Sequence, residues 1–301
     1  MRTFLAVLCL AASASNAPAQ ARRPHPEYLV QTSWLAANLQ SPRVIVLHVG
    51  HTDDRYRAGH IPGALFLPLS AVATTVAGVA NEFPPPEQLA ATFRDLGVGN
   101  AARIVIYGDD PGLFAARVWA ALDLLGQSGR ASMLDGGLAK WTAEGRTVET
   151  AVRSPHPILF KSRWRADRVV SAQWVRSHLG ERSVLFVDAR SPEQYAGTDS
   201  VARSGHLPGA KNVYWTNGLV SENDPVLKPM HALHEELWQP SGADRPQVRT
   251  IVVYCRTGMQ ASHDYFVARY IGYPDVRLYD GSMSEWASLM PAEDYPVEHS
   301  K

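Results

Sequence analysis

The sequence predicts an α/β protein of two tandem domains, each with a mostly parallel central sheet flanked by helices. Short apolar runs alternate with helix-length amphipathic segments, and Gly, Pro and Asp bound the runs, as in β/α units around a parallel sheet. The same landmarks also occur twice in the same order, so the two halves share one fold. The 301 residues, 46% of them hydrophobic, are enough for two domains that each bury a core.

The first 21 residues have the features of a secretory signal peptide. Arg2 supplies a short positive start, residues 4–12 are apolar, and small residues lead to A-x-A cleavage signals that end at Ala19 and Ala21. The apolar stretch is too short for a stable membrane anchor. We therefore expect a protein that is exported to a periplasm and is cleaved after Ala19 or Ala21.

Residues 22–150 are assigned to the first domain and residues 151–164 to a linker, which starts with a proline-containing stretch that has little periodicity. The apolar runs of the first domain predict strands, and its other landmarks lie at the turns that follow them. In chain order, the landmarks are a strand at 44–47, Gly-His-Ile-Pro-Gly-Ala at 59–64, a strand at 104–107, and Leu-Asp-Gly-Gly at 134–137 before Trp141.

Residues 165–301 are assigned to the second domain, which repeats this pattern. About seven extra residues near 196–204 are interpreted as an enlarged surface loop. Because a tryptophan follows the last landmark in both halves, we expect it to serve core packing or a contact between the domains. The second set of landmarks is a strand at 184–187, Gly-His-Leu-Pro-Gly-Ala at 205–210, a strand at 251–254, and Tyr-Asp-Gly-Ser at 279–282 before Trp286.

Cys255 is the only cysteine outside the predicted signal peptide. It follows an apolar strand and opens a six-residue loop, 255–260, ahead of a segment with helical spacing. At such a junction a thiol meets unpaired N–H groups and the positive end of a helix dipole, and both favour the thiolate. Because a lone thiol is a liability in an oxidising compartment, we predict that Cys255 is a nucleophile. The alternative is an inert, buried structural thiol.

The first half lacks this nucleophile. Aligning the repeated strands places Gly108 where the second half has Cys255, and two aspartates, Asp109 and Asp110, where it has Arg256 and Thr257. Only the second loop can therefore hold a negatively charged sulfur compound. We predict that the first domain is a catalytically silent copy.

These residues resemble the rhodanese family, specifically its tandem-domain thiosulfate and 3-mercaptopyruvate sulfurtransferases. The resemblance covers essentially the whole mature chain, and it rests on the Gly-His motif in both halves together with Val-Asp-Ala-Arg at 187–190, the loop 255–260, and Asp-Gly-Ser at 280–282 with Trp286. It implies two tandem rhodanese-like domains. It also implies double displacement: the Cys255 thiolate takes the outer sulfur of thiosulfate, and a thiophilic acceptor such as cyanide removes it.

The resemblance also implies a substrate-binding set and no metal or organic cofactor. In this family, arginine directly after the cysteine accompanies thiosulfate preference, whereas mercaptopyruvate enzymes usually have glycine there. A guanidinium suits a sulfonate-like group, although Arg256 could also be an exposed arginine without a role. Arg190 either binds substrate or only pairs with Asp188. The predicted set is Arg256, Thr257, Gly258, Met259, Gln260 and Arg190, with Asp188 in structural support.

Three positions depart from the thiosulfate enzymes of the family. Lysine often follows the loop arginine, and here the residue is Thr257. Gln194 stands where arginine often precedes the aromatic residue Tyr195, and Gln260 stands where the loop commonly ends in threonine or a basic residue. The pocket thus carries less positive charge than the best thiosulfate binders.

Alternative functions remain beside the thiosulfate enzyme. One is a 3-mercaptopyruvate sulfurtransferase, and another is a periplasmic carrier that hands a persulfide to a partner protein without turnover. A cysteine phosphatase of C-x5-R type is disfavoured, because residue 261 is alanine. The resemblance implies a small anionic donor and a thiophilic acceptor as partners. The zero formal net charge indicates neither nucleic acid nor a membrane surface as a partner.

The histidines are interpreted as structural. His60 and His206 occur in both the silent and the active half, where a shared chemical role is not expected. His231 and His234 form an H-x-x-H pair that lacks a third ligand, so no metal site is predicted. A catalytic role for His263, on the segment after the loop, is the weaker alternative to a structural one.

Overall fold

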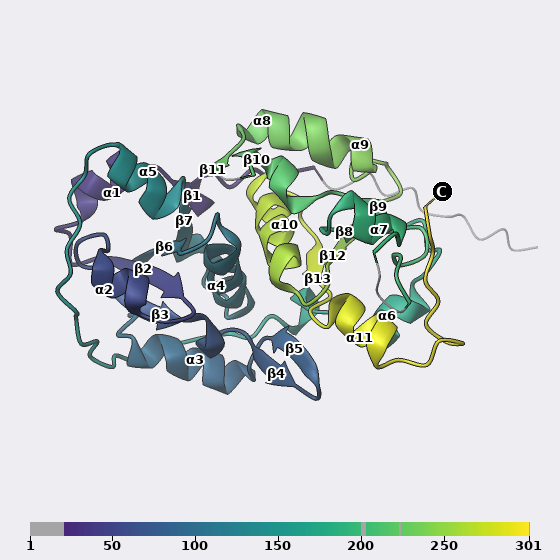
Figure 1. Cartoon of the computed structure of the whole chain (residues 1–301), viewed down its shortest axis with the longest axis horizontal. Helices are drawn as coiled ribbons and strands as arrows, with labels where there is room; N and C mark the ends of the chain where they lie inside the picture. The colour runs from purple at the N-terminus through teal and green to yellow at the C-terminus, as the bar shows by residue number, and fades with distance from the viewer. Residues whose placement is uncertain (1–20, 200–202, 223, 301) are drawn as a thin grey trace, which may run out of the picture.

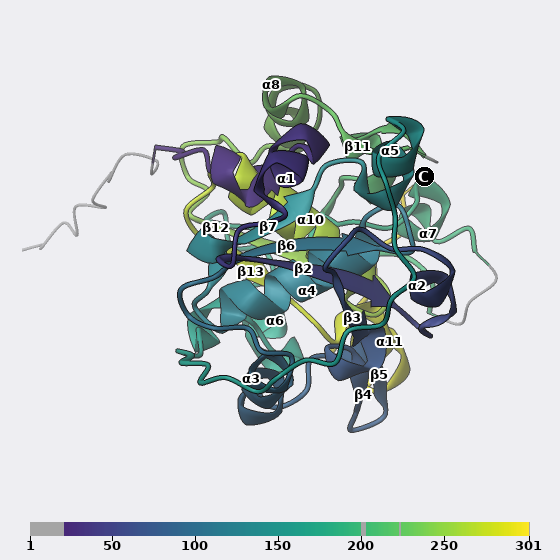
Figure 2. The ribbon, with the colours of Figure 1, turned by 90° about the vertical axis from the view of Figure 1, so that its left-hand side faces the viewer.

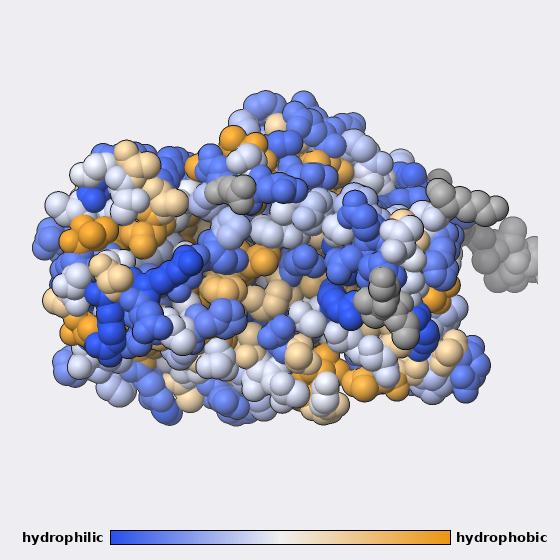
Figure 3. Space-filling model, viewed as in Figure 1, coloured by the Kyte–Doolittle hydropathy of each residue, from blue (hydrophilic) through white to orange (hydrophobic). Residues whose placement is uncertain are grey.

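The computed structural model describes residues 21–199, 203–222 and 224–300. Apart from Ala21, the predicted signal peptide lies outside the described residues. Within these ranges no helix is both long and apolar enough to span a membrane. The face of the molecule in Figure 3 is mostly hydrophilic, with small apolar patches between polar residues, as is normal for a protein surface.

The first domain has a five-stranded sheet in the order β1-β7-β6-β2-β3, with every neighbouring pair parallel (Figures 1 and 2). Its strands are β1 (Leu29–Val30), β2 (Val44–Gly50), β3 (Leu65–Pro68), β6 (Arg103–Gly108) and β7 (Ala131–Leu134). Its α-helices are α1 (Thr32–Asn38), α2 (Asp54–Ala58), α3 (Pro86–Asp95), α4 (Leu113–Leu124) and α5 (Gly137–Ala143), and its 3-10 helices are η1 (Pro26–Tyr28), η2 (Leu69–Ala71) and η3 (Ser128–Arg130).

Helices cover both faces of this sheet because alternate residues of its strands point to opposite sides. Leu47 and Val49 of β2 belong to the apolar cluster that contains the buried residues of α3 and α4. Val46, which directly precedes Leu47, belongs to the cluster that contains the buried residues of α1, α2 and α5. The parallel strands are therefore apolar on both sides, as in other sheets buried between helices.

The second domain has a four-stranded sheet in the order β13-β12-β8-β9, again entirely parallel. Its strands are β8 (Val184–Asp188), β9 (Lys211–Asn212), β12 (Thr250–Tyr254) and β13 (Val276–Leu278). Its helices are α6 (Ala172–Ser177), α7 (Pro192–Ala196), α8 (Met230–Ala232), α9 (Gln239–Ser241), α10 (Met259–Tyr270) and α11 (Ser282–Ser288), with the 3-10 helices η4 (Ala166–Arg168) and η5 (Trp215–Gly218) and a π-helical segment η6 (Leu233–Trp238).

One hydrophobic core runs through both domains. Its centre is the contact between α4 and α10, which lie side by side between the two sheets (Figure 1). Trp119 of α4 meets Phe266 of α10 edge-on, with 4.9 Å between the ring centroids. Nearly every residue of both helices is buried, which is typical of a helix that packs on all sides. The two domains thus form one folded body.

Two β-hairpins cross between the domains. The hairpin β4 (Thr74–Val76) to β5 (Val79–Glu82) leaves the first domain, and the Phe83 N–H that follows it donates to Asp280 Oδ2 over 2.7 Å. The hairpin β10 (Leu219–Ser221) to β11 (Asp224–Leu227) makes the reciprocal contact, because the Leu227 N–H donates to Asp135 Oδ1 over 3.1 Å. Each hairpin therefore reaches the Asp-Gly landmark of the other domain.

The structure confirms the predicted fold class. Residues 151–165 contain no helix or strand, while the exact limits of the domains and the linker stay predictions. The predicted enlarged loop begins where α7 ends, and residues 200–202 of it lie outside the described part of the chain. The predicted strands at 44–47, 104–107, 184–187 and 251–254 lie within β2, β6, β8 and β12.

Glu82, at the end of β5, lies in an acidic part of the domain interface. Its pKa is raised to about 7 from a usual value of 4.5, and burial is the largest cause. The charges of Asp280 and Glu285 contribute to this rise, and the charge of Arg117 opposes it. The folded protein therefore holds a proton on Glu82 at pH values where the unfolded chain has already released it.

We expect the free energy of unfolding to fall as the pH rises, because the folded state binds this proton more tightly than the unfolded chain does. The contribution of Glu82 is fully present below its unfolded pKa of 4.5 and is lost as the pH rises through about 7. Glu82→Gln should therefore show a smaller fall in Tm than wild type between about pH 5 and pH 8. Glu87→Gln, at an exposed position of α3, is the control, and identical pH slopes for wild type and Glu82→Gln would contradict the expectation.

Candidate active site

Cys255 lies where the buried strand β12 gives way to α10. The chain turns at Gly258, whose φ of +80° is one that side-chain-bearing residues rarely adopt. A Cβ at this position would also lie 2.3 Å from Asp280 Oδ1. Both observations require glycine at this position. The turn at Gly258 brings the first turn of α10 back over the sulfur. We call residues 255–260 the cysteine loop.

The sulfur of Cys255 is enclosed by backbone N–H groups, as the sequence predicted. The N–H groups of Thr257, Gln260 and Ala261 donate toward it, and each lowers the pKa of the thiol. The residue is only 1% exposed, however, and its burial, the largest single cause, gives the thiol a pKa above its usual value. The charge of Asp188 raises it as well.

For the enclosed thiol, the pKa is therefore shifted in the opposite direction to the one expected from the helix N-terminus. The physical reason is that burial and the Asp188 charge together raise the pKa more than the three N–H groups lower it. The same N–H groups still face the sulfur, so they are placed to stabilise negative charge as it forms.

The segment after β13 holds the start of the cysteine loop. The Cys255 N–H donates to Ser282 Oγ over 3.0 Å, and the Met283 N–H donates to the Cys255 carbonyl over 3.1 Å. Ser282 itself has a φ of +52° and donates its hydroxyl to the Tyr279 carbonyl over 2.9 Å. Sequence reasoning noted Asp-Gly-Ser without a role for the serine. The first half has Gly137 at the matching position. This difference between the repeats is the sequence signal that could have indicated a role for Ser282.

Most of the remaining residues of the cysteine loop lie closer to the protein surface than Cys255 does. Arg256, Thr257, Met259 and Gln260 are partly exposed, whereas Gly258 is buried against Asp280. Among the described residues, the side chains of Arg256 and Gln260 have no hydrogen-bond or ion-pair partner. The guanidinium of Arg256 is therefore available to an anion.

A residue of the first domain also contacts the cysteine loop. Asn81 Nδ2 donates to Thr257 Oγ1 over 3.2 Å, from the hairpin that crosses the interface. Sequence reasoning missed Asn81, because nothing local to residues 79–82 indicates which part of the other domain they contact. Thr257, which stands where thiosulfate enzymes of the family often have lysine, is thus part of a contact between the domains.

Arg190 is committed to an ion pair. Its Nε donates to Asp188 Oδ1 over 2.9 Å and its Nη2 to Asp188 Oδ2 over 2.6 Å, and Nη2 also donates to the Gly205 carbonyl over 2.7 Å. Both side chains are almost completely buried. Of the two alternatives for Arg190, the structure favours the ion pair with Asp188. The charge of Arg190 still interacts with Cys255, so the pair lies close behind the sulfur. A direct contact with substrate stays a prediction.

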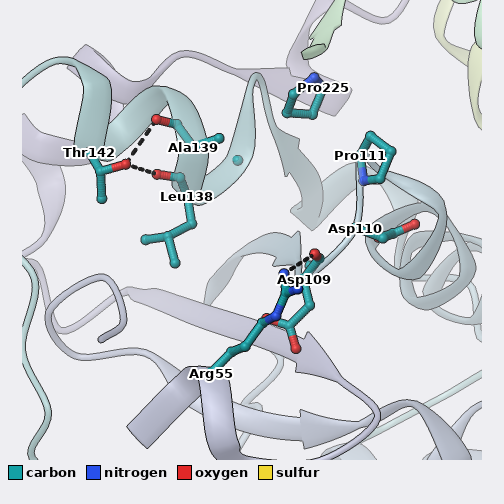
Figure 4. A pocket seen from close by; sticks show the side chains of 10 residues that line it. Arg55, Asp109, Asp110, Pro111, Leu138, Ala139, Thr142 and Pro225 are labelled. Carbon is teal, nitrogen blue, oxygen red and sulfur yellow. Dashed lines mark hydrogen bonds between the residues drawn. The ribbon is translucent and has the colours of Figure 1, made fainter. Parts of the chain in front are cut away.

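The corresponding loop of the first domain is arranged differently. Gly108 ends β6, and the carboxylate of Asp110 accepts from the N–H groups of Leu113, over 2.7 Å, and Phe114, over 3.0 Å. These are N–H groups of the first turn of α4, so a carboxylate of the loop itself accepts from the start of this helix. Beside this loop lies a pocket of about 410 Å³, with Arg55 donating to the Asp109 carbonyl (Figure 4). This arrangement agrees with a silent first domain.

The repeated aromatic and histidine landmarks are structural. His60 stacks on Tyr56 and His206 on Tyr195, each pair with 3.8 Å between ring centroids. The two landmark tryptophans are buried in the cores of their own domains, which is one of the two expected roles. His263 is buried against Trp215.

The H-x-x-H pair forms no metal site with its neighbours. His234 Nε2 lies 2.7 Å from Asp244 Oδ2, so a carboxylate of the protein already contacts this histidine. In the part of the chain that the structure describes, no group of three or more His, Cys, Asp or Glu side chains could hold a metal ion.

Known proteins share both the sequence and the arrangement of this chain. A sulfur carrier protein, TtuD, from Thermus thermophilus is 33% identical over 88% of this chain and 95% of its own length. A thiosulfate sulfurtransferase from Pseudomonas aeruginosa is 32% identical over 90% of this chain and 96% of its own. The crystal structure of SseA from Escherichia coli, described as a 3-mercaptopyruvate sulfotransferase with the rhodanese fold, matches with a TM-score of 0.73 and 27% identity, over 85% of this chain and 98% of that one.

The family match covers both halves of the chain. Residues 31–144 and residues 171–289 each correspond to the Rhodanese-like domain, and together they include the silent loop and the cysteine loop. The resemblance inferred from the repeated landmarks is thereby confirmed. With two such domains in tandem and relatives above 30% identity along most of its length, the chain belongs to the rhodanese family.

Proposed function

We propose that this protein is a sulfurtransferase that moves sulfane sulfur from thiosulfate to a thiophilic acceptor, such as cyanide, through a persulfide on Cys255. The observation that carries the proposal is the cysteine loop. It directs three backbone N–H groups at one sulfur and leaves the guanidinium of Arg256 without a protein partner among the described residues. Its relatives include proteins named for this activity.

The reaction divides into two displacements at sulfur. The Cys255 thiol first loses its proton to solvent, and the thiolate attacks the outer sulfur of thiosulfate. A new S–S bond forms, the S–S bond of thiosulfate breaks, and its electron pair leaves with sulfite. Cyanide then attacks the outer sulfur of the persulfide, thiocyanate departs, and the thiolate is regenerated. Deprotonation and the second displacement both leave negative charge on the Cys255 sulfur, beside the N–H groups of the loop.

Arg256 supports thiosulfate as the donor. A guanidinium can donate two parallel hydrogen bonds to the oxygens of a sulfonate-like group, and no ion pair with a described residue competes for it. The guanidinium of Arg256 could also bind the carboxylate of 3-mercaptopyruvate. This alternative donor is supported by the fold shared with SseA. The donor preference is therefore the part of the proposal that the substitution of Arg256 tests.

A carrier role is the second candidate. It is favoured by the relative named as a sulfur carrier protein, and by the small exposure of Cys255, which suits a persulfide that is held until an acceptor removes it. Steady thiocyanate formation from thiosulfate and cyanide supports the enzyme. Loading of one sulfur per chain without turnover supports the carrier.

Cys255→Ser tests the assigned nucleophile. We expect thiocyanate formation to fall by at least about 10³-fold, because a hydroxyl is a far weaker nucleophile toward sulfur. Mass spectrometry after exposure to thiosulfate should show one added sulfur on wild type and none on the variant. Thermal unfolding is the control, since the exchange of one atom should leave the fold intact. A variant that still transfers sulfur would refute the assignment.

Arg256→Gly tests the donor. We expect kcat/KM for thiosulfate to fall by roughly ten- to a hundredfold, the size of a lost charge-assisted hydrogen bond, with a smaller fall for 3-mercaptopyruvate. Arg182→Gly, at an exposed turn before β8 and away from the loop, is the matched control. An equal loss for the two donors would remove the basis for preferring thiosulfate.

We also propose that the protein is exported, on the strength of residues 1–21 alone. Expressed with its own N-terminus in a Gram-negative host, it should accumulate in the periplasmic fraction. N-terminal sequencing should then start at Gln20 or Arg22. Recovery of the uncleaved chain from the cytoplasm would contradict export without affecting the chemistry.

A further inference from the structure

A buried arginine of the silent domain lies directly behind the cysteine loop. Arg117, on α4, is completely buried, and its guanidinium sits 3.4 Å from the centroid of the Phe83 ring. All five N–H donors of the side chain have acceptors. Nε donates to the Val72 carbonyl over 3.3 Å, Nη1 to Ser262 Oγ over 3.2 Å and to Asp280 Oδ1 over 2.5 Å, and Nη2 to Asp280 Oδ2 over 3.0 Å and to the Asn81 carbonyl.

These bonds lead into the cysteine loop from two sides. Ser262, which accepts from Arg117, donates its own hydroxyl to the Gly258 carbonyl over 2.8 Å. Asp280, the ion-pair partner, lies against Gly258 and precedes by two residues the serine that holds the Cys255 N–H. The middle and the start of the loop therefore rest on one buried ion pair between the domains.

The reverse contact is not equivalent. Arg117 follows Gly112 by five residues, and His263 follows Gly258 by five residues, so the two occupy matching places on α4 and α10. The His263 ring lies close to Gly112, where a Cβ would be 3.7 Å from it. Neither ring nitrogen of His263 has a hydrogen-bond partner among the described residues. Among the described residues, only the first domain thus supplies a hydrogen-bonded support for the loop of the other domain.

We propose that Arg117 is a positioning residue for sulfur transfer: by holding Asp280 and Ser262 it keeps the cysteine loop in the shape that aims its N–H groups at the sulfur. This inference rests on the proposed function at Cys255. It assigns the silent domain a part in the reaction, because its arginine completes the support of the active loop. Misplacement of such a loop by about 1 Å costs on the order of a hundredfold in rate.

The test compares Arg117→Lys with Asp123→Asn in the full-length protein. Lysine keeps the positive charge but cannot form the fork that binds both oxygens of Asp280, so any change at Cys255 reports geometry and not lost charge. Asp123, also on α4, accepts from the Tyr265 hydroxyl of α10 over 2.5 Å. Its substitution weakens the same interface away from the cysteine loop, which makes Asp123→Asn the matched control.

Two measurements follow the loop independently of stability. The first is the pH dependence of Cys255 alkylation by iodoacetamide, since Asp188 and Arg190, the charged groups that interact with the sulfur, are unchanged in every variant. The second is the single-turnover rate of persulfide formation with thiosulfate. For Arg117→Lys we expect the alkylation profile to move to higher pH and the rate to fall by about tenfold or more. For Asp123→Asn we expect a lower Tm with both measurements within about twofold of wild type.

If Arg117→Lys does not fold, the pair Arg117→Met with Asp280→Asn replaces it, because it leaves no unpaired buried charge. The same displacement of the alkylation profile is expected. A wild-type profile in either variant, or an equal displacement in Asp123→Asn, overturns the proposal. Alkylation needs no sulfur donor, so a shifted profile beside a wild type that transfers no sulfur would reject the proposed function and keep the positioning role.

Discussion

A buried sulfur that must carry negative charge is the constraint on which the rest of this structure depends. Cys255 is closed off from water, and burial works against its ionisation. What offsets this cost is the inward direction of the Thr257, Gln260 and Ala261 N–H groups, and that direction exists only while the chain turns tightly at Gly258. The strand, the turn and the first turn of α10 therefore act together as one device for stabilising charge on sulfur.

The comparison of the two halves shows how small the difference is between the loop that carries the candidate nucleophile and its counterpart. Both loops join a parallel strand to the long helix at the domain interface, and both helices begin after a glycine with positive φ. In the first domain the helix N–H groups are taken by Asp110, and glycine replaces the cysteine. The fold of this domain is intact, but its loop has no nucleophile and its N–H groups have a permanent internal acceptor.

The sequence predicted the elements that depend on local pattern. Apolar strands followed by helical spacing, written twice with matching glycines and tryptophans, were enough for the α/β fold, the duplication and the identity of Cys255 as the candidate nucleophile. The direction of the pKa shift of its thiol was predicted wrongly, because the N–H groups are local whereas burial is a sum over the whole interior. Arg190 was left between two roles because ion-pair geometry is invisible in a spacing.

By itself, the sequence determined which residue types follow which strand, and hence the chemistry that the second loop can perform. Only the tertiary structure decided which parts of the silent domain touch that loop. Asn81 and Arg117 come from segments more than a hundred residues away, and they meet the cysteine loop because a hairpin and a helix cross the interface. Contacts between segments so distant depend on how two closed domains pack, and no local periodicity records that packing.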